Sequence, residues 1–253
     1  MAYTNSKLIS YTKLSPNHSG QRTHSIDRIT PHCVVGQLSC ESICGCFTSP
    51  SRQASCNYGI GKDGRISLCV EEKNRSWCSS SNANDQRAVT IECASDMSEP
   101  YAMNSAVYNS LVRLCTDICK RNGKKKLLWF ADKNKTLNYT PKADEMVLTV
   151  HRWFANKSCP GNWLYSRLGD LAAKVTSELS KTTSGGGTAS TSQMYRVRKT
   201  WSDSKSQLGA YKLLANAKKK ADENAGYKVF DASGNLVYPA AATPAPAPVT
   251  GTS

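Results

Sequence analysis

Two histidines and one cysteine have the types and the spacing of a metal site. His151 lies in the run HRWFANKSCPG, eight residues before Cys159, and the Pro160-Gly161 pair that follows is typical of a turn. Such a turn can bring a thiolate back beside an imidazole. Together with His32, these residues provide two nitrogen donors and one sulfur donor and leave a fourth position open, the pattern of a catalytic rather than a structural zinc site. The competing interpretation is that both histidines are ordinary strand-end residues and that Cys159 is a buried thiol. Spacing alone leaves both interpretations open.

The segments that position these side chains are short strands. Apolar runs bounded by turn residues predict strands over residues 28–36, 54–61, 65–70, 88–93, 127–130 and 146–150. The Lys62-Asp63-Gly64 run between the second and third of them is typical of a hairpin turn. His32 lies near the end of the first strand and His151 directly follows the last one, so both imidazoles are expected at strand ends.

Helical periodicity accompanies the strands. One apolar face comprises Val107, Leu111, Leu114 and Ile118, and a second comprises Leu164, Leu168, Leu171, Val175 and Leu179. Gly123 is a suitable stop after the first face, and residues 37–47 predict a further short helix. The sum is an α/β domain with a mixed central sheet flanked by helices.

Composition divides the chain into four segments. Residues 1–180 form the predicted catalytic domain, and residues 181–193 (KTTSGGGTASTSQ) have the Gly/Ser/Thr content of a flexible linker. Residues 194–239 predict a small α+β module, with a strand over 195–198, a basic helix over 209–221 and a hairpin of 228–231 with 236–238. Residues 240–253 form a Pro/Ala-rich tail that is expected to be disordered.

The whole chain has 253 residues, of which 39% are hydrophobic and 21% charged, and this excludes a wholly disordered protein. No apolar run approaches the roughly 20 residues needed to span a bilayer, so membrane insertion is not expected. The polar N-terminal segment lacks the apolar stretch of a signal peptide. The sequence therefore predicts a protein made in the cytoplasm without an export signal.

A formal net charge of +14 predicts attraction to polyanions. Nucleic acid, anionic lipid and anionic cell-wall polymer are candidates, and simple solubility is the competing explanation. Residues 1–180 carry 23 basic and 15 acidic residues, a charge of +8, and residues 181–253 carry 10 and 4, a charge of +6. The even spread favours a broad anionic surface over one narrow groove.

All eleven cysteines precede residue 160, and an odd number cannot all pair. In a reducing compartment most of them stay free. Cys40, Cys44 and Cys46 lack the second ligand pair of a zinc finger. Cys115 and Cys119 fall in a helical pattern as buried small hydrophobic residues.

Four runs carry a resemblance to a known family: SPNHSGQR with IDRITPHCVVGQ, then ASCNYGIGKDGRI, RSWCSSSNANDQRAVTIECAS and HRWFANKSCPG. In this order and spacing they resemble the zinc-dependent N-acetylmuramoyl-L-alanine amidases of the bacteriophage endolysin type, which share the peptidoglycan-recognition-protein-like fold. The resemblance covers about Ser15 to Leu164. It implies hydrolysis of the amide bond between N-acetylmuramic acid and L-alanine in peptidoglycan, lysis of Gram-positive cells, and action on the cell wall after release from the host cytoplasm.

The resemblance also implies roles for single residues. It makes His32, His151 and Cys159 the zinc ligands, Glu92 the catalytic acid and Lys157 the cation beside the metal. Some relatives use a tyrosine ahead of the KDG turn instead of the glutamate. That position is Cys56 here and Tyr58 lies two residues later, which indicates the glutamate subtype and leaves a catalytic role for Tyr58 in doubt.

The residue types suit amide hydrolysis independently. A carboxylate beside a metal-bound water can take its proton and pass it to the leaving amine. Glu92 lies between Ile91 and Cys93 on a predicted buried strand, so its pKa is expected to rise. Lys157 can stabilise the developing oxyanion. The competing interpretations are a buried carboxylate paired with an arginine and a solvated loop lysine.

Two further features stay open. The segment containing Trp77, Asn82, Asn84 and Asp85 has a common sugar-binding composition, which is also ordinary loop composition. The C-terminal run from YRVRKTW to GNLVY resembles the small cell-wall-binding modules of clostridial-type lysins. Its aromatic residues serve either as glycan platforms or as core, and its charge predicts binding to anionic cell-wall polymer.

Two other classes compete with the enzyme: a non-catalytic peptidoglycan-binding protein on the same fold and a basic nucleic-acid-binding protein. Non-catalytic relatives typically lose the cysteine ligand, so Cys159 favours the enzyme. No recognised motif supports nucleic-acid binding.

Overall fold

The computed structural model describes residues 3–181, 194–211, 213–231, 234 and 236–238. The chain divides into two compact units, Met1–Gly185 and Gly186–Ser253. The predicted tail and, apart from Lys181, the predicted linker lie outside the described residues. None of the helices in the described part of the chain has both the length and the apolar character needed to cross a bilayer.

A seven-stranded sheet forms the centre of the first unit. Its strands are β1 (Ile9–Thr12), β3 (Arg28–Cys33), β4 (Tyr58–Ile60), β5 (Ile66–Leu68), β7 (Ala88–Cys93), β8 (Lys126–Leu128) and β9 (Glu145–Leu148). Their order is β1-β5-β4-β7-β3-β9-β8. The hairpin pair β4–β5 is antiparallel and every other pair is parallel. Two further strands, β2 (His18–Gln21) and β6 (Asn74–Ser76), form a small antiparallel sheet.

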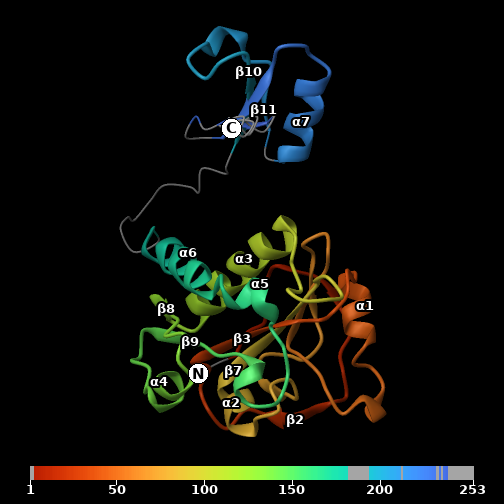
Figure 1. Cartoon of the computed structure of the whole chain (residues 1–253), viewed down its shortest axis with the longest axis vertical. Helices are drawn as coiled ribbons and strands as arrows, with labels where there is room; N and C mark the ends of the chain where they lie inside the picture. Colours follow the sequence, from red (N-terminus) through yellow and green to blue (C-terminus); the bar gives the residue numbers. More distant parts are fainter. Residues whose placement is uncertain (1–2, 182–193, 212, 232–233, 235, 239–253) are drawn as a thin grey trace, which may run out of the picture. The chain divides into compact units, whose positions relative to one another are not determined.

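Among the described residues of the first unit, six α-helices accompany this sheet: α1 (Cys40–Gly45), α2 (Asn82–Arg87), α3 (Ser105–Arg121), α4 (Lys133–Asn138), α5 (Gly161–Tyr165) and α6 (Leu168–Lys181). Two 3-10 helices, Pro50–Arg52 and His151–Trp153, lie in the connections. Helices α3 and α6 lie side by side (Figure 1). The predicted mixed sheet flanked by helices is therefore confirmed.

The two faces of the sheet are covered by different helices. Tyr58 and Ile60 of β4 belong to the main core, together with the buried residues of α3 and α6. Because side chains alternate along a strand, Gly59 between them faces the other side. There a Cβ on Gly59 would lie only 2.7 Å from Ile43 Cγ2 of α1. The missing side chain lets α1 pack closely on this second face.

The second unit is a separate small α+β fold. Its strands β10 (Tyr195–Arg198), β11 (Gly209–Tyr211), β12 (Lys228–Phe230) and β13 (Leu236–Tyr238) form an antiparallel sheet in the order β11-β10-β12-β13. Helix α7 (Leu214–Asp222) and a 3-10 helix, Ser204–Ser206, complete it. The core comprises Val197, Ala217, Ala221 and Val229.

Three predictions of secondary structure are corrected. The helix predicted over 209–221 begins only at Leu214, because Gly209–Tyr211 pair with β10 as a strand. The single helix face predicted from Leu164 to Leu179 is divided between α5 and α6. The N–H of Ser166 bonds to Asn162 O and the N–H of Arg167 bonds to Leu164 O, and these bonds close the first helix. Finally, the loop predicted around residues 82–85 contains α2, capped where the Ser81 side chain accepts from Asn84 N.

Candidate metal and catalytic site

Strand register places His32 and Glu92 on the same face of the sheet. His32 of β3 lies opposite Glu92 of β7, and Glu92 lies opposite Gly59 of β4. In-register neighbours share a face, so both side chains lie on the face that α1 covers at Gly59. Their neighbours Ile91 and Cys93 lie in the main core on the other face. The alternation of β7 therefore directs one carboxylate out of an otherwise apolar strand and onto the α1 side of the sheet.

The segment after β9 folds back to bring Cys159 to the same place. His151 begins a 3-10 helix directly after the strand. The N–H of Arg152 donates to Cys159 O at 3.1 Å, and the N–H of Gly161 donates to Ser158 O at 2.9 Å. The Cys159 thiol then lies 3.2 Å from His32 Nδ1. The turn predicted after the cysteine thus brings the thiol beside an imidazole, although that imidazole belongs to His32.

The donor atoms of His32, His151 and Cys159 all lie within 4.8 Å of one another. The two imidazole centroids are 5.1 Å apart. His32 Nε2 is buried without a hydrogen-bond partner. His151 Nε2 lies 3.0 Å from Ser80 Oγ. When Nε2 donates to that oxygen, Nδ1 keeps its lone pair for a metal, as in most histidine ligands.

Electrostatics keeps the imidazoles in the form that binds metal. Burial lowers the pKa of His32 well below its usual value, and the charge of His151 lowers it further. Burial and then the charge of Lys157 also lower the pKa of His151. Contact with the Cys33 thiol, followed by burial, raises the pKa of the Cys159 thiol. A bound cation reverses this last effect, because it favours the thiolate. Two neutral imidazoles and one thiol fit zinc, which prefers nitrogen and sulfur donors.

A second group of donors overlaps the first. Donor atoms of His32, Cys78 and Glu92 also lie within 4.8 Å of one another. Glu92 Oε1 lies 3.9 Å from Cys78 Sγ, while Glu92 Oε2 is buried without a hydrogen-bond partner. The set of His32, His151 and Cys159 suits zinc better and leaves the carboxylate of Glu92 unbound beside it.

Glu92 is a buried carboxyl with a raised pKa. Burial raises its pKa to about 7, although the charge of Arg52 and a bond from Cys78 act in the opposite direction. No ion pair involves Glu92 among the residues that the structure describes. Of the competing role, a buried carboxylate paired with an arginine, only the charge of Arg52 is present, without a hydrogen bond or an ion pair.

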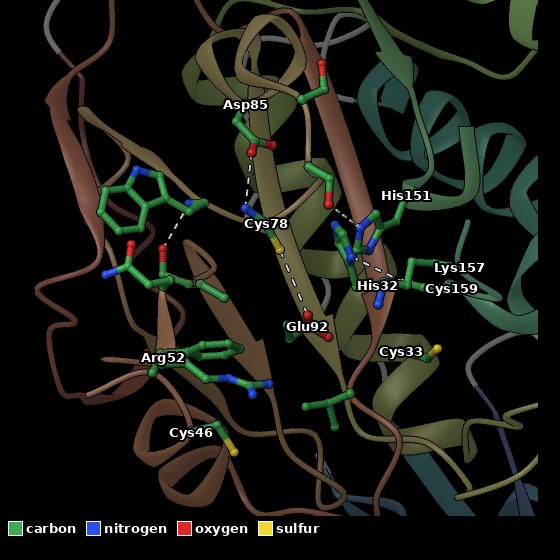
Figure 2. Close-up of a pocket in the computed structure, with 18 of the residues that line it drawn as sticks. His32, Cys33, Cys46, Arg52, Cys78, Asp85, Glu92, His151, Lys157 and Cys159 are labelled. Atoms are coloured by element: carbon green, nitrogen blue, oxygen red, sulfur yellow. Dashed lines mark hydrogen bonds between the residues drawn. The ribbon is translucent and has the colours of Figure 1, made fainter. Parts of the chain in front are cut away.

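The three candidate metal ligands and Glu92 line one cavity of about 720 Å³ (Figure 2). Lys157 lines it next to the two histidines and Cys159. The size suits an elongated ligand, since small-molecule sites commonly occupy ~300–1,000 Å³. The predicted metal-binding and catalytic residues thus all reach a single hollow.

Only some residues of the segment 77–85, whose function the sequence left open, line the cavity. Trp77, Asn82 and Asp85 line the cavity, but Asn84 does not. Asn84 is buried and donates to Thr30 Oγ1 at 3.0 Å. The Asp85 carboxylate accepts from Ser79 Oγ at 2.6 Å and from Cys78 N at 3.1 Å, so it holds its own loop. Trp77 and Asn82 are the members left for ligand contact.

Sequence reasoning did not identify Ser80 or Arg52 as pocket residues. Ser80 has a left-handed φ of 63° and faces His151, and Arg52 reaches the cavity from the 3-10 helix Pro50–Arg52. Neither residue belongs to a sequence motif whose spacing indicates a functional site. Tyr58 is excluded from the site, because its hydroxyl is buried on the other face and donates to Glu72 Oε1 at 2.6 Å.

Residues 22–162 match the N-acetylmuramoyl-L-alanine amidase family. The structure is similar to PlyL (14% identity, TM-score 0.47, covering 65% of this chain and 95% of that one). It is also similar to an AmpD derivative (18% identity, TM-score 0.48, 68% and 99%). A third similar structure is the Ph2119 endolysin from Thermus scotoductus MAT2119 bacteriophage Ph2119 (16% identity, TM-score 0.43, 61% and 88%). No curated protein matches the sequence.

Proposed function

Since this chain belongs to the N-acetylmuramoyl-L-alanine amidase family, we propose that it is a zinc-dependent, endolysin-like hydrolase of Gram-positive peptidoglycan. The bond cleaved is the amide between the lactyl group of N-acetylmuramic acid and the L-alanine of the stem peptide. The convergence of His32, His151 and Cys159, with the Glu92 carboxylate beside them in one cavity, carries the proposal. Lys157, Trp77 and Asn82 complete the proposed site, since they also line the cavity.

In the proposed mechanism, His32, His151 and Cys159 would hold zinc, which would polarise the amide carbonyl and lower the pKa of the attacking water. Glu92 takes a proton from the attacking water and delivers it to the leaving amine nitrogen. A pKa near 7 suits both steps, because the same group must accept and then release a proton near neutral pH.

Lys157 stabilises the negative charge that develops on the amide oxygen. Its ammonium lies at the cavity beside the histidines, close enough to lower the pKa of His151. A positioned donor of this kind contributes roughly 2.7–4 kcal/mol in other acyl-transfer enzymes. The alternative role, a solvated loop lysine, predicts a negligible effect of its removal.

The second unit is proposed to anchor the enzyme to the wall. All four of its tyrosines (Tyr195, Tyr211, Tyr227 and Tyr238) pack, half-buried, against its small core, and the Trp201 ring lies 6.0 Å from that of Phe230. Lys199, Lys205, Lys219 and Lys228 are exposed. Charge attraction to anionic cell-wall polymer is therefore the stronger basis for binding.

The function is tested on purified Gram-positive cell walls with and without a chelator. The expected result is falling turbidity and new N-terminal alanine, both abolished by the chelator and restored by zinc. Release of reducing sugar without free alanine indicates a glycosidase and contradicts the proposal. Wall binding without any cleavage indicates a non-catalytic peptidoglycan-binding protein on the same fold.

A further inference from the structure

Arg52 is a pocket residue without an assigned role. Its side chain reaches the cavity from one side of Glu92, and the metal-site residues lie on the other (Figure 2). Its charge is close enough to lower the pKa of Glu92. No hydrogen bond or ion pair engages the guanidinium within the described part of the chain.

Buried polar side chains hold the segment that leads to Arg52. Asn17 Nδ2 donates to Phe47 O at 3.0 Å and to Ser49 O at 2.9 Å. Ser15 Oγ donates to Phe47 O at 2.5 Å. Asn17 is 2% exposed and Ser15 is 4% exposed. Three hydrogen bonds from buried residues thus fix the carbonyls that precede the 3-10 helix. The SPNH run, which contains Ser15 and Asn17, therefore holds the segment before Arg52 and takes no part in the candidate metal site.

The 3-10 helix Pro50–Arg52 is also held at its C-terminal end, by Gln53. Gln53 adopts a left-handed φ of 50°, which is uncommon for a residue with a side chain. Its N–H and its Nε2 both bond to Pro50 O, at 3.4 and 2.8 Å. Backbone strain of this kind is maintained where the surroundings impose it, commonly at ligand sites. Arg52 therefore projects from a turn that is constrained on both sides.

Within the described part of the chain, neither carboxylate that lines the cavity forms an ion pair with Arg52. The Asp85 carboxylate is occupied by bonds from Ser79 and Cys78. Glu92 is the other carboxylate in the lining, and no hydrogen bond or ion pair joins it to Arg52 in the described part of the chain. A guanidinium presents a planar fork of donors that matches a carboxylate in two parallel bonds.

We propose that Arg52 forms a carboxylate-binding subsite for the second residue of the stem peptide. This inference rests on the proposed function. In stem peptides whose D-glutamate is linked through its γ-carboxyl, the α-carboxylate branches off one residue beyond the scissile amide. One residue of extended chain spans ~3.3–3.6 Å, so this carboxylate lies within a cavity of this size when the amide lies at the metal. Arg52 then selects isoglutamate over isoglutamine stems.

The test compares matched muramyl peptides that differ in one group. Wild-type protein with zinc is given N-acetylmuramoyl-L-alanyl-D-isoglutamate and the D-isoglutamine analogue, each also with its terminal carboxyl amidated. The expected preference for free isoglutamate is about 10- to 100-fold in kcat/KM, the effect of a charge-assisted pair. Arg52→Gln brings the ratio close to one, and Arg52→Lys retains part of it. Arg113→Gln, the same charge change on α3 outside the cavity, keeps the wild-type ratio.

The ratio between two substrates separates recognition from catalysis. Loss of Arg52 also changes the pKa of Glu92 and hence the turnover of every substrate, but this effect cancels in the ratio. Calorimetric binding of the same peptides gives the preference without turnover, so failure of the amidase proposal and failure of this inference are distinguishable. A wild-type ratio near one, a ratio unchanged in Arg52→Gln, or a preference that follows the terminal carboxylate overturns the assignment.

Discussion

Burial determines the chemistry of single residues in the cavity. It lowers the pKa values of His32 and His151 and raises that of Glu92, so the imidazoles stay neutral while the carboxyl can hold a proton near neutral pH. Each shift disfavours the charged form of its group. A bound cation would supply the charge that this environment lacks, which is why these three donors and one acid suit the proposed metal enzyme.

Activity should fall on the acid side through the titration of Glu92. The carboxylate form accepts the proton, so kcat/KM decreases as pH falls through its pKa. Burial raises that pKa from 4.5 to about 7, and bound zinc lowers it again, so the acid limb is expected between these values. Glu92→Gln should lose roughly 10²–10⁴-fold in kcat/KM together with that limb. Full activity of this variant contradicts the proton-carrier role.

Metal binding can be measured without activity. A ligand that binds only the folded state at 100 times its Kd adds about 2.7 kcal/mol to the unfolding free energy, which corresponds to about 5–10 °C in Tm for a domain of this size. Wild-type protein stripped of metal should show this rise on addition of zinc. Cys159→Ser should lose most of it, whereas Cys46→Ser, an exposed cavity thiol outside the ligand set, should retain it. Equal losses in both variants contradict the assigned ligands.

At the scale of elements, three adjacent strands present Gly59, Glu92 and His32 in register on one face of the sheet. Helix α1 packs on the sheet at Gly59, which has no side chain, and the cavity lies over the polar side chains of Glu92 and His32. Beyond α1 the chain continues through Phe47 to Arg52, both in the cavity lining. The position of α1 on the sheet therefore determines one wall of the site.

A methyl group at Gly61 should disturb this packing. A Cβ there would lie 2.5 Å from Cys40 N and 3.1 Å from Ser39 C, both backbone atoms at the start of α1. Since backbone cannot rotate away, Gly61→Ala should lower the unfolding free energy by about 1–3 kcal/mol in urea denaturation. Gly45→Ala at the other end of α1 meets nothing within 4 Å and should be neutral or slightly stabilising. A neutral Gly61→Ala would mean that α1 can shift at little cost.

Sequence patterns predict elements best where periodicity and turn signals agree. The run AVTIEC predicts β7 with its observed bounds, and the Lys62-Asp63-Gly64 turn predicts the β4–β5 hairpin. By contrast, β11 has three residues, too few for a period, and only its pairing with β10 makes it a strand. The metal-site residues lie in recognisable motifs. Arg52 enters the cavity because buried Asn17 and Ser15 bond to a distant loop, a tertiary relation that no local spacing encodes.

At the scale of the whole molecule, the chain comprises two units with separate cores. The candidate metal ligands and the cavity residues lie in the first unit, whereas the second exposes several lysines. The net charge of +14 is shared by both regions of the chain. The proposed anionic, insoluble substrate suits this division, because a second unit that bound the wall would raise the local concentration of the first unit there.

Removal of residues 186–253 should therefore separate chemistry from wall binding. The fragment 1–185 keeps the whole main core and should cleave a soluble muramyl peptide with kcat/KM within about twofold of the full chain. On intact walls it should act more slowly, because it lacks the proposed anchor, and the difference should shrink at high salt as charge attraction is screened. Full-length Cys159→Ser should still sediment with walls while releasing no alanine. If the fragment loses activity on the soluble peptide, or if Cys159→Ser loses wall binding together with hydrolysis, the two units do not divide the work in this way.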